Sequence, residues 1–274
     1  MTGSLTETQV GNYRRDGILF PIRIMPETEA ATLLSDLLAL QAREGGRLSK
    51  RTNQKPHLLV PWIHALCREP AILDAVESVI GSDILVWGSG FFAKGAGDGS
   101  YISWHQDSTY WGLSEPEIVT AWVALTPSTP ESGCMQVIPG THTRDQVPHR
   151  DTFAADNLLS RGQEIAVEVD RSQAVNVVLR PGEMSLHHVR IFHGSDPNRA
   201  DHARVGFAIR YIPTRLRQIG ERTSATLVRG TDRYGHFDPE PAPTAPFAPE
   251  AVEFHAATID RTFSVLYAGA DKPA

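Results

Sequence analysis

The sequence predicts a mainly β protein with helical decoration, in the α+β class, whose core is an antiparallel sandwich or barrel. Short runs of β-branched and aromatic residues, separated by Gly, Pro and Asp turns, fill the middle of the chain. These runs do not alternate regularly with helical patterns, which disfavours a doubly wound parallel sheet. The helical patterns come first, and 274 residues with 41% hydrophobic content are enough to bury a large core.

The helical patterns occupy the first 82 residues. Thr6 followed by Gln9 fits a capping box, which predicts a short helix that ends before Gly17. Leucines at helical spacing in residues 27–44 predict a second helix with one buried face; they are Leu33, Leu34, Leu37, Leu38 and Leu40. Another amphipathic pattern predicts a helix over residues 70–80. We interpret these apolar stripes as core.

Strand patterns occupy the next part of the chain. Seven runs are predicted to be strands: 83–94, 100–105, 117–126, 133–140, 174–180, 182–189 and 204–212. Residues 141–173 are polar and form a long excursion of the kind that often covers a site. Residues 235–249 are proline-rich and expected to be irregular, before a short helix from about residue 250. We expect one domain over residues 1–274, with a helical part (1–82), a core (about 83–217) and a C-terminal arm (218–274).

Charge and composition exclude several classes of partner. The net charge of −6 and the scattered basic residues disfavour nucleic acid. No apolar run approaches the roughly 18 residues of a membrane span. The N-terminus lacks the pattern of a secretory signal, and two cysteines, Cys67 and Cys134, fit reduced, packed thiols. We therefore expect a cytoplasmic protein with a small-molecule partner; the sequence does not indicate its oligomeric state.

The stretch "SWHQDSTYW" holds a candidate metal motif. His105 and Asp107 stand two residues apart, so in an extended strand both project to the same face and can reach one cation. Taken alone, the pair is more typical of a strand-terminal histidine followed by a turn at Asp107 than of a metal site. A metal site needs a further ligand from elsewhere in the chain.

His193 is the candidate for that ligand, because it ends an apolar strand before a Gly/Ser/Asp/Pro/Asn loop. Two imidazoles and one carboxylate make a facial triad, which leaves three positions open on a six-coordinate metal. That set suits Fe(II) with a chelating cosubstrate and dioxygen, whereas structural zinc normally takes four protein ligands. Arg204, eleven residues after His193, could pair with the far carboxylate of 2-oxoglutarate, and Ser195 could add a hydrogen bond. A surface salt bridge and a turn cap are the alternatives for these two residues.

The ordered motifs "WHQD", "AWVALT", "GCMQVIPGTH", "PGEMSLHH" and "HGSDPNRADHARVGFAIRY" resemble the phytanoyl-CoA dioxygenase family of Fe(II)/2-oxoglutarate oxygenases. The resemblance runs from "YRRDGILF" near residue 10 to about residue 217. It implies a double-stranded β-helix core, the cupin-like jelly roll, with helices packed outside. It also implies three iron ligands, which are His105, Asp107 and His193.

The resemblance extends to the cosubstrate site. It implies that Arg204 and Ser195 bind the 2-oxoglutarate carboxylate, that Trp122 lines the cosubstrate pocket and that Gln106 points near it. It implies a hydroxylase that uses O2 and releases succinate and CO2. Halogenases of the same superfamily have a small residue at the position of Asp107, so oxygenation is the expected reaction.

The composition and the motifs also bear on the class of substrate. The absence of an obvious basic surface for a CoA phosphate favours a small polar metabolite, such as an amino acid derivative, an aminophosphonate or a natural-product intermediate. Tyr110, Trp111, Lys94 and Tyr101 are expected to border its pocket. Lys94 binds an anionic group of the substrate or cosubstrate, or else is a solvated lysine at a strand end.

Two other interpretations remain open at this point. A cupin-like isomerase or lyase would use the same fold without 2-oxoglutarate, but it has no need of Arg204. A non-enzymatic sheet domain that binds a ligand has no need of the histidines and the aspartate together. The neighbouring His187 and His188 are expected to be core residues.

Overall fold

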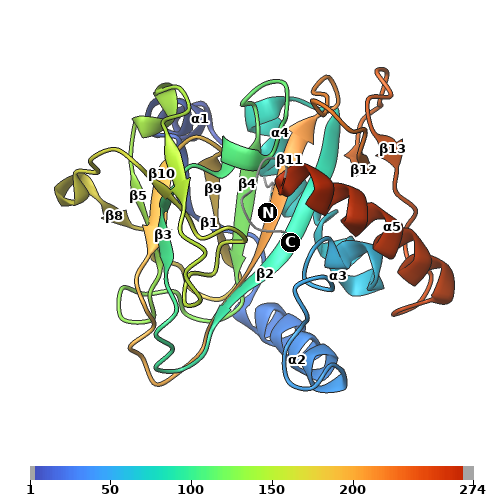
Figure 1. Ribbon diagram of the computed structural model, residues 1–274, viewed down its shortest axis with the longest axis horizontal. Helices are drawn as coiled ribbons and strands as arrows, with labels where there is room; N and C mark the ends of the chain where they lie inside the picture. Colours follow the sequence, from blue (N-terminus) through green and yellow to red (C-terminus); the bar gives the residue numbers. More distant parts are fainter. Residues whose placement is uncertain (1–3, 268–274) are drawn as a thin grey trace.

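Two β-sheets face each other (Figure 1). Buried side chains of both sheets pack between them. The computed structural model describes residues 4–267. The larger sheet has the strand order β1-β9-β4-β11-β2-β12-β13 and the smaller has β3-β10-β5-β8, with a separate pair, β6-β7. All neighbouring strands are antiparallel except β12 and β13.

The strands of the larger sheet are β1 (Ile18–Arg23), β2 (Ile84–Lys94), β4 (Val119–Ala124), β9 (Glu183–His188), β11 (Arg204–Pro213), β12 (Ser224–Arg229) and β13 (Asp238–Pro239). The other strands are β3 (Ile102–His105), β5 (Met135–Ile138), β6 (His149–Asp151), β7 (Gln163–Ile165), β8 (Val175–Asn176) and β10 (Phe192–Ser195).

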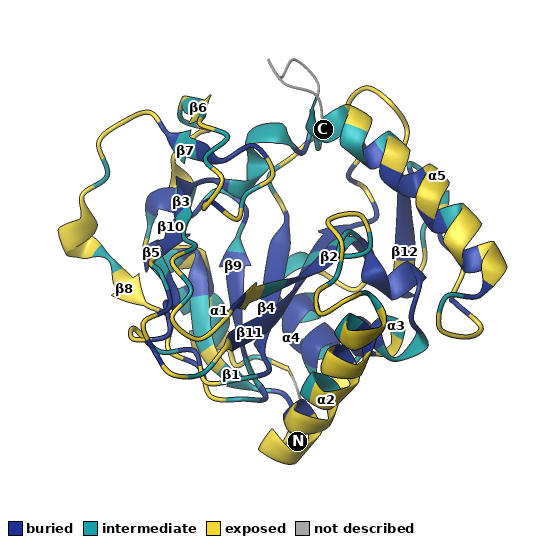
Figure 2. Ribbon diagram, turned by 60° about the horizontal axis from the view of Figure 1, so that its bottom comes forward, coloured by how far each residue is buried: buried dark blue, intermediate teal, exposed yellow. Residues whose placement is uncertain are grey.

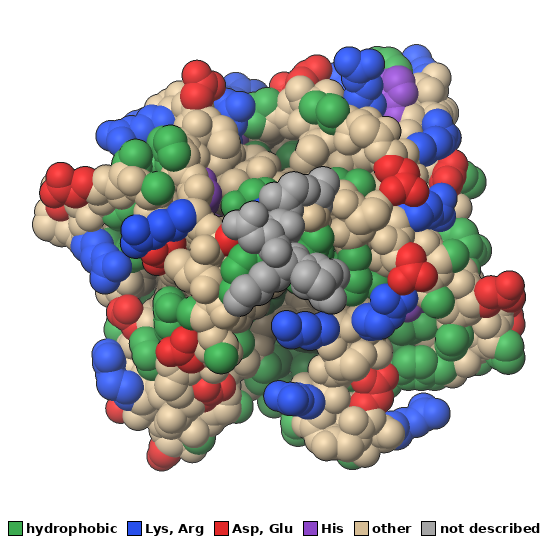
Figure 3. Space-filling view, viewed as in Figure 1, with side chains coloured by type: hydrophobic (Ala, Val, Ile, Leu, Met, Phe, Trp, Pro, Cys, Tyr) green, Lys and Arg blue, Asp and Glu red, His purple; other side chains and the backbone are tan. Residues whose placement is uncertain are grey.

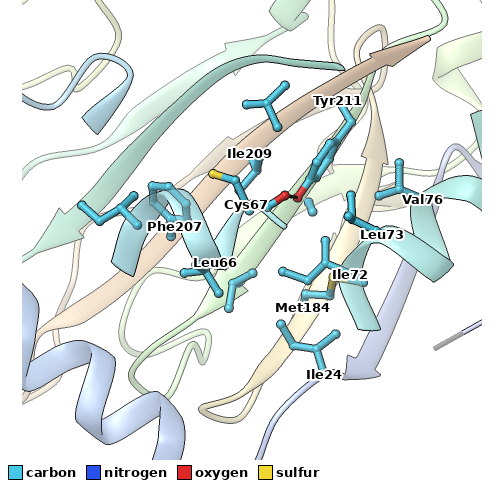
Figure 4. Packing of buried hydrophobic residues seen from close by; sticks show 14 of the residues in the cluster. Ile24, Leu66, Cys67, Ile72, Leu73, Val76, Met184, Phe207, Ile209 and Tyr211 are labelled. Atoms are coloured by element: carbon cyan, nitrogen blue, oxygen red, sulfur yellow. Dashed lines mark hydrogen bonds between the residues drawn. The ribbon is translucent and has the colours of Figure 1, made fainter. Parts of the chain in front are cut away.

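Helices cover the outer face of the larger sheet. They are α1 (Glu7–Asp16), α2 (Glu27–Arg43), α3 (Pro61–Leu66) and α4 (Pro70–Ile80). Helix α5 (Pro249–Leu266) lies beside β12 and β13 instead (Figure 1), and its Leu266 packs against the cluster that contains Trp87 and Trp111. Figure 2 shows buried strands in the middle of the molecule and helices with exposed outer faces. Figure 4 shows how α3 and α4 pack on β11, where Tyr211 donates a hydrogen bond to the carbonyl of Cys67 at 3.0 Å.

The two faces of the larger sheet have different neighbours because side chains alternate along a strand. Phe207, Ile209 and Tyr211 of β11 belong to the core shared with the helices. Ala208 of β11 and Trp122 of β4 instead pack in the interior against Met135 and neighbouring residues of the smaller sheet. This architecture, which is mostly β with two facing sheets and outer helices, confirms the predicted jelly roll.

Most predicted elements are present. The capping box of Thr6 and Gln9 forms at α1, and all seven strand predictions overlap observed strands, although β8 keeps only two residues. One detail of the second helix is wrong: Leu38 is 55% exposed, and the buried positions of α2 are Ala30, Leu37 and Leu40.

Three strands of the larger sheet were not predicted: β1, β12 and the two-residue β13, which lies in the proline-rich segment 235–249 that was expected to be irregular. β1 contains Pro21, and a proline weakens the prediction of a strand. The proline is tolerated because β1 is an edge strand of the sheet. The predicted C-terminal arm contains β12, which pairs with β2, as well as α5, an 18-residue helix rather than a short one. The excursion over residues 141–173 contains β6 and β7. The limits of a single domain stay a prediction.

Charged side chains of both signs are mixed on the surface. In the view of Figure 3, Lys and Arg side chains alternate with Asp and Glu rather than gathering into one basic area. Within residues 4–267, no helix combines the length and the apolar character that a membrane crossing needs.

Candidate metal centre

Two neighbouring strands of the smaller sheet bring the predicted ligands together. His105 ends β3 and is the Cα partner of His193 on β10. Asp107 follows as the first residue of a 3₁₀ turn (Asp107–Tyr110), and its backbone N–H donates to the carbonyl of Val189 at 3.0 Å. Ligand atoms of the three side chains all lie within 4.8 Å of one another. The structure thus assembles the three residues into one cluster that can hold a metal ion.

Backbone carbonyls orient both imidazoles. Nδ1 of His105 lies 2.9 Å from the carbonyl oxygen of Ser103, and Nδ1 of His193 lies 3.0 Å from that of Ile191. A carbonyl fixes the proton on Nδ1 and leaves the Nε2 lone pair free for a metal. The Nε2 atoms lie 3.3 Å (His105) and 3.9 Å (His193) from Oδ1 of Asp107.

The charge states at this cluster are those that ligands require. Burial, and next the neighbouring His105, lower the pKa of His193 to about 3, so its imidazole is neutral. Burial raises the pKa of Asp107, but hydrogen bonding with His105 and His187 and the effect of His193 outweigh it and hold the pKa well below its usual range. Neutral imidazole and ionised carboxylate are the forms that bind a metal ion.

His187 lies beside this cluster and is buried, as a core residue is expected to be. Its Nε2 lies 3.9 Å from Oδ2 of Asp107, and its ring centre lies 5.2 Å from that of His193. Met184 and Leu186 of β9 pack toward the helices, so the alternation of side chains along the strand turns His187 to the interior. His188 does not face the cluster but lies 5.2 Å, between ring centres, from His142.

A second polar feature of the interior is the guanidinium of Arg204 on β11. Arg204 is 2% exposed, and neither its Nε nor its Nη2 has a hydrogen-bond partner among the described residues. Its Cζ lies 5.3 Å from the ring centre of Trp122. Burial lowers the pKa of Arg204 to about 10, which still leaves the guanidinium charged at neutral pH. An unpaired buried guanidinium is costly and is typical of a site that awaits an anion.

A glycine makes room for the ring beside Arg204. A Cβ atom at Gly206 would lie 2.0 Å from Cζ2 of Trp122, so only glycine lets the indole lie against β11. The indole ring of Trp122 and the guanidinium of Arg204 therefore lie side by side on the interior face of the larger sheet.

Lys94 and Ser195 lie next to Arg204 in the interior. Lys94 is fully buried, and its Cα is the cross-strand partner of Arg204. Its Nζ donates to Oγ of Ser195 at 2.7 Å and to the carbonyl of Asp196 at 2.5 Å. The alternative of a solvated lysine at a strand end is wrong, because Lys94 has no exposed surface.

The donor set fits the groups that the sequence analysis expected. Nitrogen and oxygen ligands without cysteine suit Fe(II), and the unpaired atoms of Arg204 suit the far carboxylate of a dicarboxylate such as 2-oxoglutarate. The fit rests on the chemistry of these side chains.

Gln106 has a different role from the expected one. Its Nε2 donates to the carbonyls of Arg190 (3.0 Å) and Asp145 (3.4 Å), and its Oε1 accepts from Gln146 Nε2 (3.0 Å) and the backbone N–H of Val147 (2.9 Å). These bonds use all of its donors and acceptors. Gln106 therefore holds the start of the excursion over residues 141–173 beside the metal motif, and its assignment to the cosubstrate is corrected.

The residues expected to border the substrate pocket lie in different parts of the structure. Tyr110 donates its hydroxyl to Asp151 at 2.6 Å, and Trp111 is buried, 5.0 Å between ring centres from Trp87. Tyr101 and Trp104 line a hollow of about 410 Å³. None of the three candidate metal ligands lines this hollow. Contact of Tyr101, Tyr110 and Trp111 with a substrate stays a prediction.

Comparison with known proteins agrees with this site. A "Probable alpha-ketoglutarate-dependent hypophosphite dioxygenase" of Stutzerimonas stutzeri is 27% identical over 162 residues, which are 58% of this chain and 56% of that protein. The chain spans about half the length of the curated relatives that it matches. Among solved structures, the non-heme monooxygenase ThoJ has a TM-score of 0.84 and 36% identity, covering 94% of this chain and 97% of its own.

CytC3 with Fe(II) and alpha-ketoglutarate is another similar structure, with a TM-score of 0.65, 25% identity and coverage of 86% of this chain and 93% of its own. Residues 13–206 match the family described as Phytanoyl-CoA dioxygenase (PhyH). This match covers most of the chain, including the metal cluster and Arg204. The chain belongs to the phytanoyl-CoA dioxygenase family.

Proposed function

We propose that this protein is a non-haem Fe(II)/2-oxoglutarate-dependent dioxygenase that hydroxylates a C–H bond of a small polar metabolite. The observation that carries the proposal is the pairing of a three-ligand cluster with a buried, unpaired guanidinium in one interior: His105, Asp107 and His193 on one side, Arg204 on the other. An isomerase or lyase of the same fold has no use for the second group.

Each residue has a defined task in this proposal. The two histidines and Asp107 would hold the iron, and the carbonyls of Ser103 and Ile191 keep both imidazoles turned toward it. Arg204 would pair with the far carboxylate of 2-oxoglutarate, next to the ring of Trp122. When bound, Fe(II), 2-oxoglutarate and O2 supply the oxidation: one oxygen atom enters the substrate C–H bond and the other enters succinate, with release of CO2.

Further observations support the substrate class and the location. Relatives named for hypophosphite and ectoine are consistent with small polar substrates, and the mixed charges of the visible face offer no basic area for a CoA phosphate. Cys67 and Cys134 are buried free thiols, which fit the reducing cytoplasm.

The test compares wild-type protein with Asp107→Ala and with the control Asp260→Asn, which changes an exposed ion pair with Arg51. Anaerobic addition of Fe(II) and 2-oxoglutarate to the wild type and the control should give weak visible charge-transfer absorption. With air, both should form succinate. Asp107→Ala should lose iron retention and succinate formation. Full turnover by Asp107→Ala would show that the triad assignment is wrong, and a wild type without the absorption would favour an isomerase, a lyase or a binding protein.

A further inference from the structure

Strand β11 carries a second arginine on the same face as Arg204. Phe207, Ile209 and Tyr211 point toward the helices (Figure 4), so the alternate residues Arg204, Ala208 and Arg210 project to the interior. Arg204 lies at the cosubstrate end of the strand. Arg210, six residues further along, is not used by the proposed iron or cosubstrate site.

Arg210 lacks an anionic partner. Its Nε is buried without a hydrogen-bond partner, and within residues 4–267 no ion pair or hydrogen bond of its side chain is found. Its Cζ instead lies 5.5 Å from the ring centre of Phe92 and 5.7 Å from that of Trp111. Burial lowers the pKa of Arg210, and the charge of Asp107 raises it, which places the guanidinium within electrostatic reach of the metal ligand.

Strand β2 presents no side chain to this guanidinium. The cross-strand partner of Arg210 is Gly88, and a Cβ atom at Gly90 would lie 3.8 Å from Nη1 of Arg210 and 2.8 Å from the carbonyl oxygen of Asn53. Both positions that could carry a side chain against the guanidinium are therefore glycines. Arg210 is also partly exposed, unlike Arg204, so a ligand can approach it.

Arg210 is one end of a polar row across the sheet. Its partner on β4 is Thr120, and the partner of Thr120 on β9 is His187. Oγ1 of Thr120 and Nδ1 of His187 are also buried without partners among the described residues. The row ends beside the metal cluster, because Nε2 of His187 lies 3.9 Å from Oδ2 of Asp107.

We propose that Arg210, Thr120 and His187 form a subsite that binds a carboxylate group of the primary substrate beside the metal centre. This inference rests on the proposed function, and it selects carboxylate metabolites, such as amino acid derivatives, over aminophosphonates. A guanidinium pairs with a planar carboxylate through two parallel hydrogen bonds. One cation balances one monoanion, whereas a dianionic phosphonate would add an uncompensated charge close to Asp107.

The subsite has a consequence for the ligand-free protein. Arg210 has no anionic partner among the described residues whose loss would destabilise the fold, so Arg210→Gln should change the melting temperature of the ligand-free protein little. If Arg210 were a structural ion-pair residue, the same substitution would lower the melting temperature.

The binding test uses acetate and propionate, their matched amides acetamide and propionamide, and methylphosphonate. Ligand-detected NMR measures their binding to the anaerobic protein saturated with Fe(II) and 2-oxoglutarate. Wild type should bind the acids at least tenfold more tightly than the amides, and methylphosphonate no better than acetate. Arg210→Gln should lose this preference by about tenfold or more, the usual size of a hydrogen bond to a charged group. Thr120→Val should weaken it less, and the control Arg217→Gln, an exposed position, should keep it.

Two results would overturn the subsite: acids and amides that bind equally to the wild type, or an Arg210→Gln protein that keeps the preference. Tighter binding of methylphosphonate than acetate would overturn the choice of a carboxylate. The charge-transfer absorption separates this failure from that of the proposed function, because it reports iron and 2-oxoglutarate alone. A wild type without absorption contradicts the proposed function, whereas normal absorption with an unaffected Arg210→Gln protein contradicts only the subsite.

Discussion

The Nζ atom of Lys94 lies 2.7 Å from the Oγ atom of Ser195, and this contact determines what the serine can do. Nζ also donates to the carbonyl of Asp196, with a third and longer contact to the carbonyl of Ser195 at 3.4 Å. An ammonium has three donors, and all three are used. Because the hydroxyl of Ser195 accepts from Lys94, its own hydrogen is free to point to an anion that pairs with Arg204.

Lys94 should therefore act as a positioning residue for 2-oxoglutarate. In Lys94→Met, the hydroxyl of Ser195 loses the donor that orients it, and one positive charge beside the anion is removed. We expect the Kd of 2-oxoglutarate to rise about tenfold or more, with iron affinity close to that of the wild type. Anaerobic titration of the charge-transfer absorption measures both. Ser195→Ala is the matched variant, and combined with Lys94→Met it should add little. Wild-type 2-oxoglutarate affinity in Lys94→Met would contradict this role.

The affinity for 2-oxoglutarate should depend on pH through Lys94. Burial, and next the charge of Arg204, lower the pKa of Lys94 to about 7. A bound dianion favours the protonated amine and raises this pKa, so binding takes up a proton above pH 7. The Kd should thus be lowest below about pH 7 and should rise above it, by at most roughly tenfold for each pH unit. Titrations at several pH values measure the slope. The slope should vanish in Lys94→Met, and a wild-type Kd that is independent of pH would rule the coupling out.

Gly206 should be intolerant of a side chain. A Cβ atom there would lie 2.0 Å from Cζ2 of Trp122, so Gly206→Ala must displace the indole next to Arg204. We expect a loss of about 1–3 kcal/mol in the free energy of unfolding and weaker 2-oxoglutarate binding. Urea denaturation and the anaerobic titration give the two values. Gly99→Ala is the control, because a Cβ atom there has no neighbour within 4 Å. Equal behaviour of the two variants would mean that the close approach at Gly206 does not matter.

Local patterns predicted the part of the site that lies on strands. The spacing of His105 and Asp107 requires only strand geometry, and His193 and Arg204 follow from strand-end contexts that the structure reproduces as β10 and β11. The partners of Gln106 could not be predicted in the same way. They lie in the segment 145–147 and at Arg190, about 40 and 84 residues away, and such contacts depend on how the long excursion folds back.

To predict that His187 and Arg210 point to the interior, one must know which face of the larger sheet packs against the helices. Both faces of the larger sheet are buried, so the apolar residues of β9 and β11 do not by themselves say which side is the interior. The strand β12 was missed for a related reason, because it joins β2 across more than a hundred residues of chain. Pairing at that distance leaves no local sequence signal.

A buried ion pair should hold the C-terminal arm to the sheet. Glu240 contacts Lys55 at 2.5 Å and His57 at 3.3 Å, and both hydroxyls of Ser224 and Thr226 donate to it. Burial raises the pKa of the Glu240 carboxyl, but Lys55 and His57 outweigh burial and hold the pKa well below its usual range. The ionised carboxylate is thus the form that the folded protein prefers.

Glu240→Gln should lower the free energy of unfolding by about 3–5 kcal/mol at neutral pH, because it leaves Lys55 as an uncompensated buried charge. The stabilisation by Glu240 is present above its unfolded pKa of about 4.3 and is lost as the pH falls toward its folded value, so the difference between variant and wild type should shrink in acid. Urea denaturation at neutral pH and near pH 4 measures this. Asp260→Asn, which removes an exposed ion pair with Arg51, should change the free energy by about 0–1 kcal/mol. A difference that stays constant with pH would show that Glu240 acts through packing rather than through its charge.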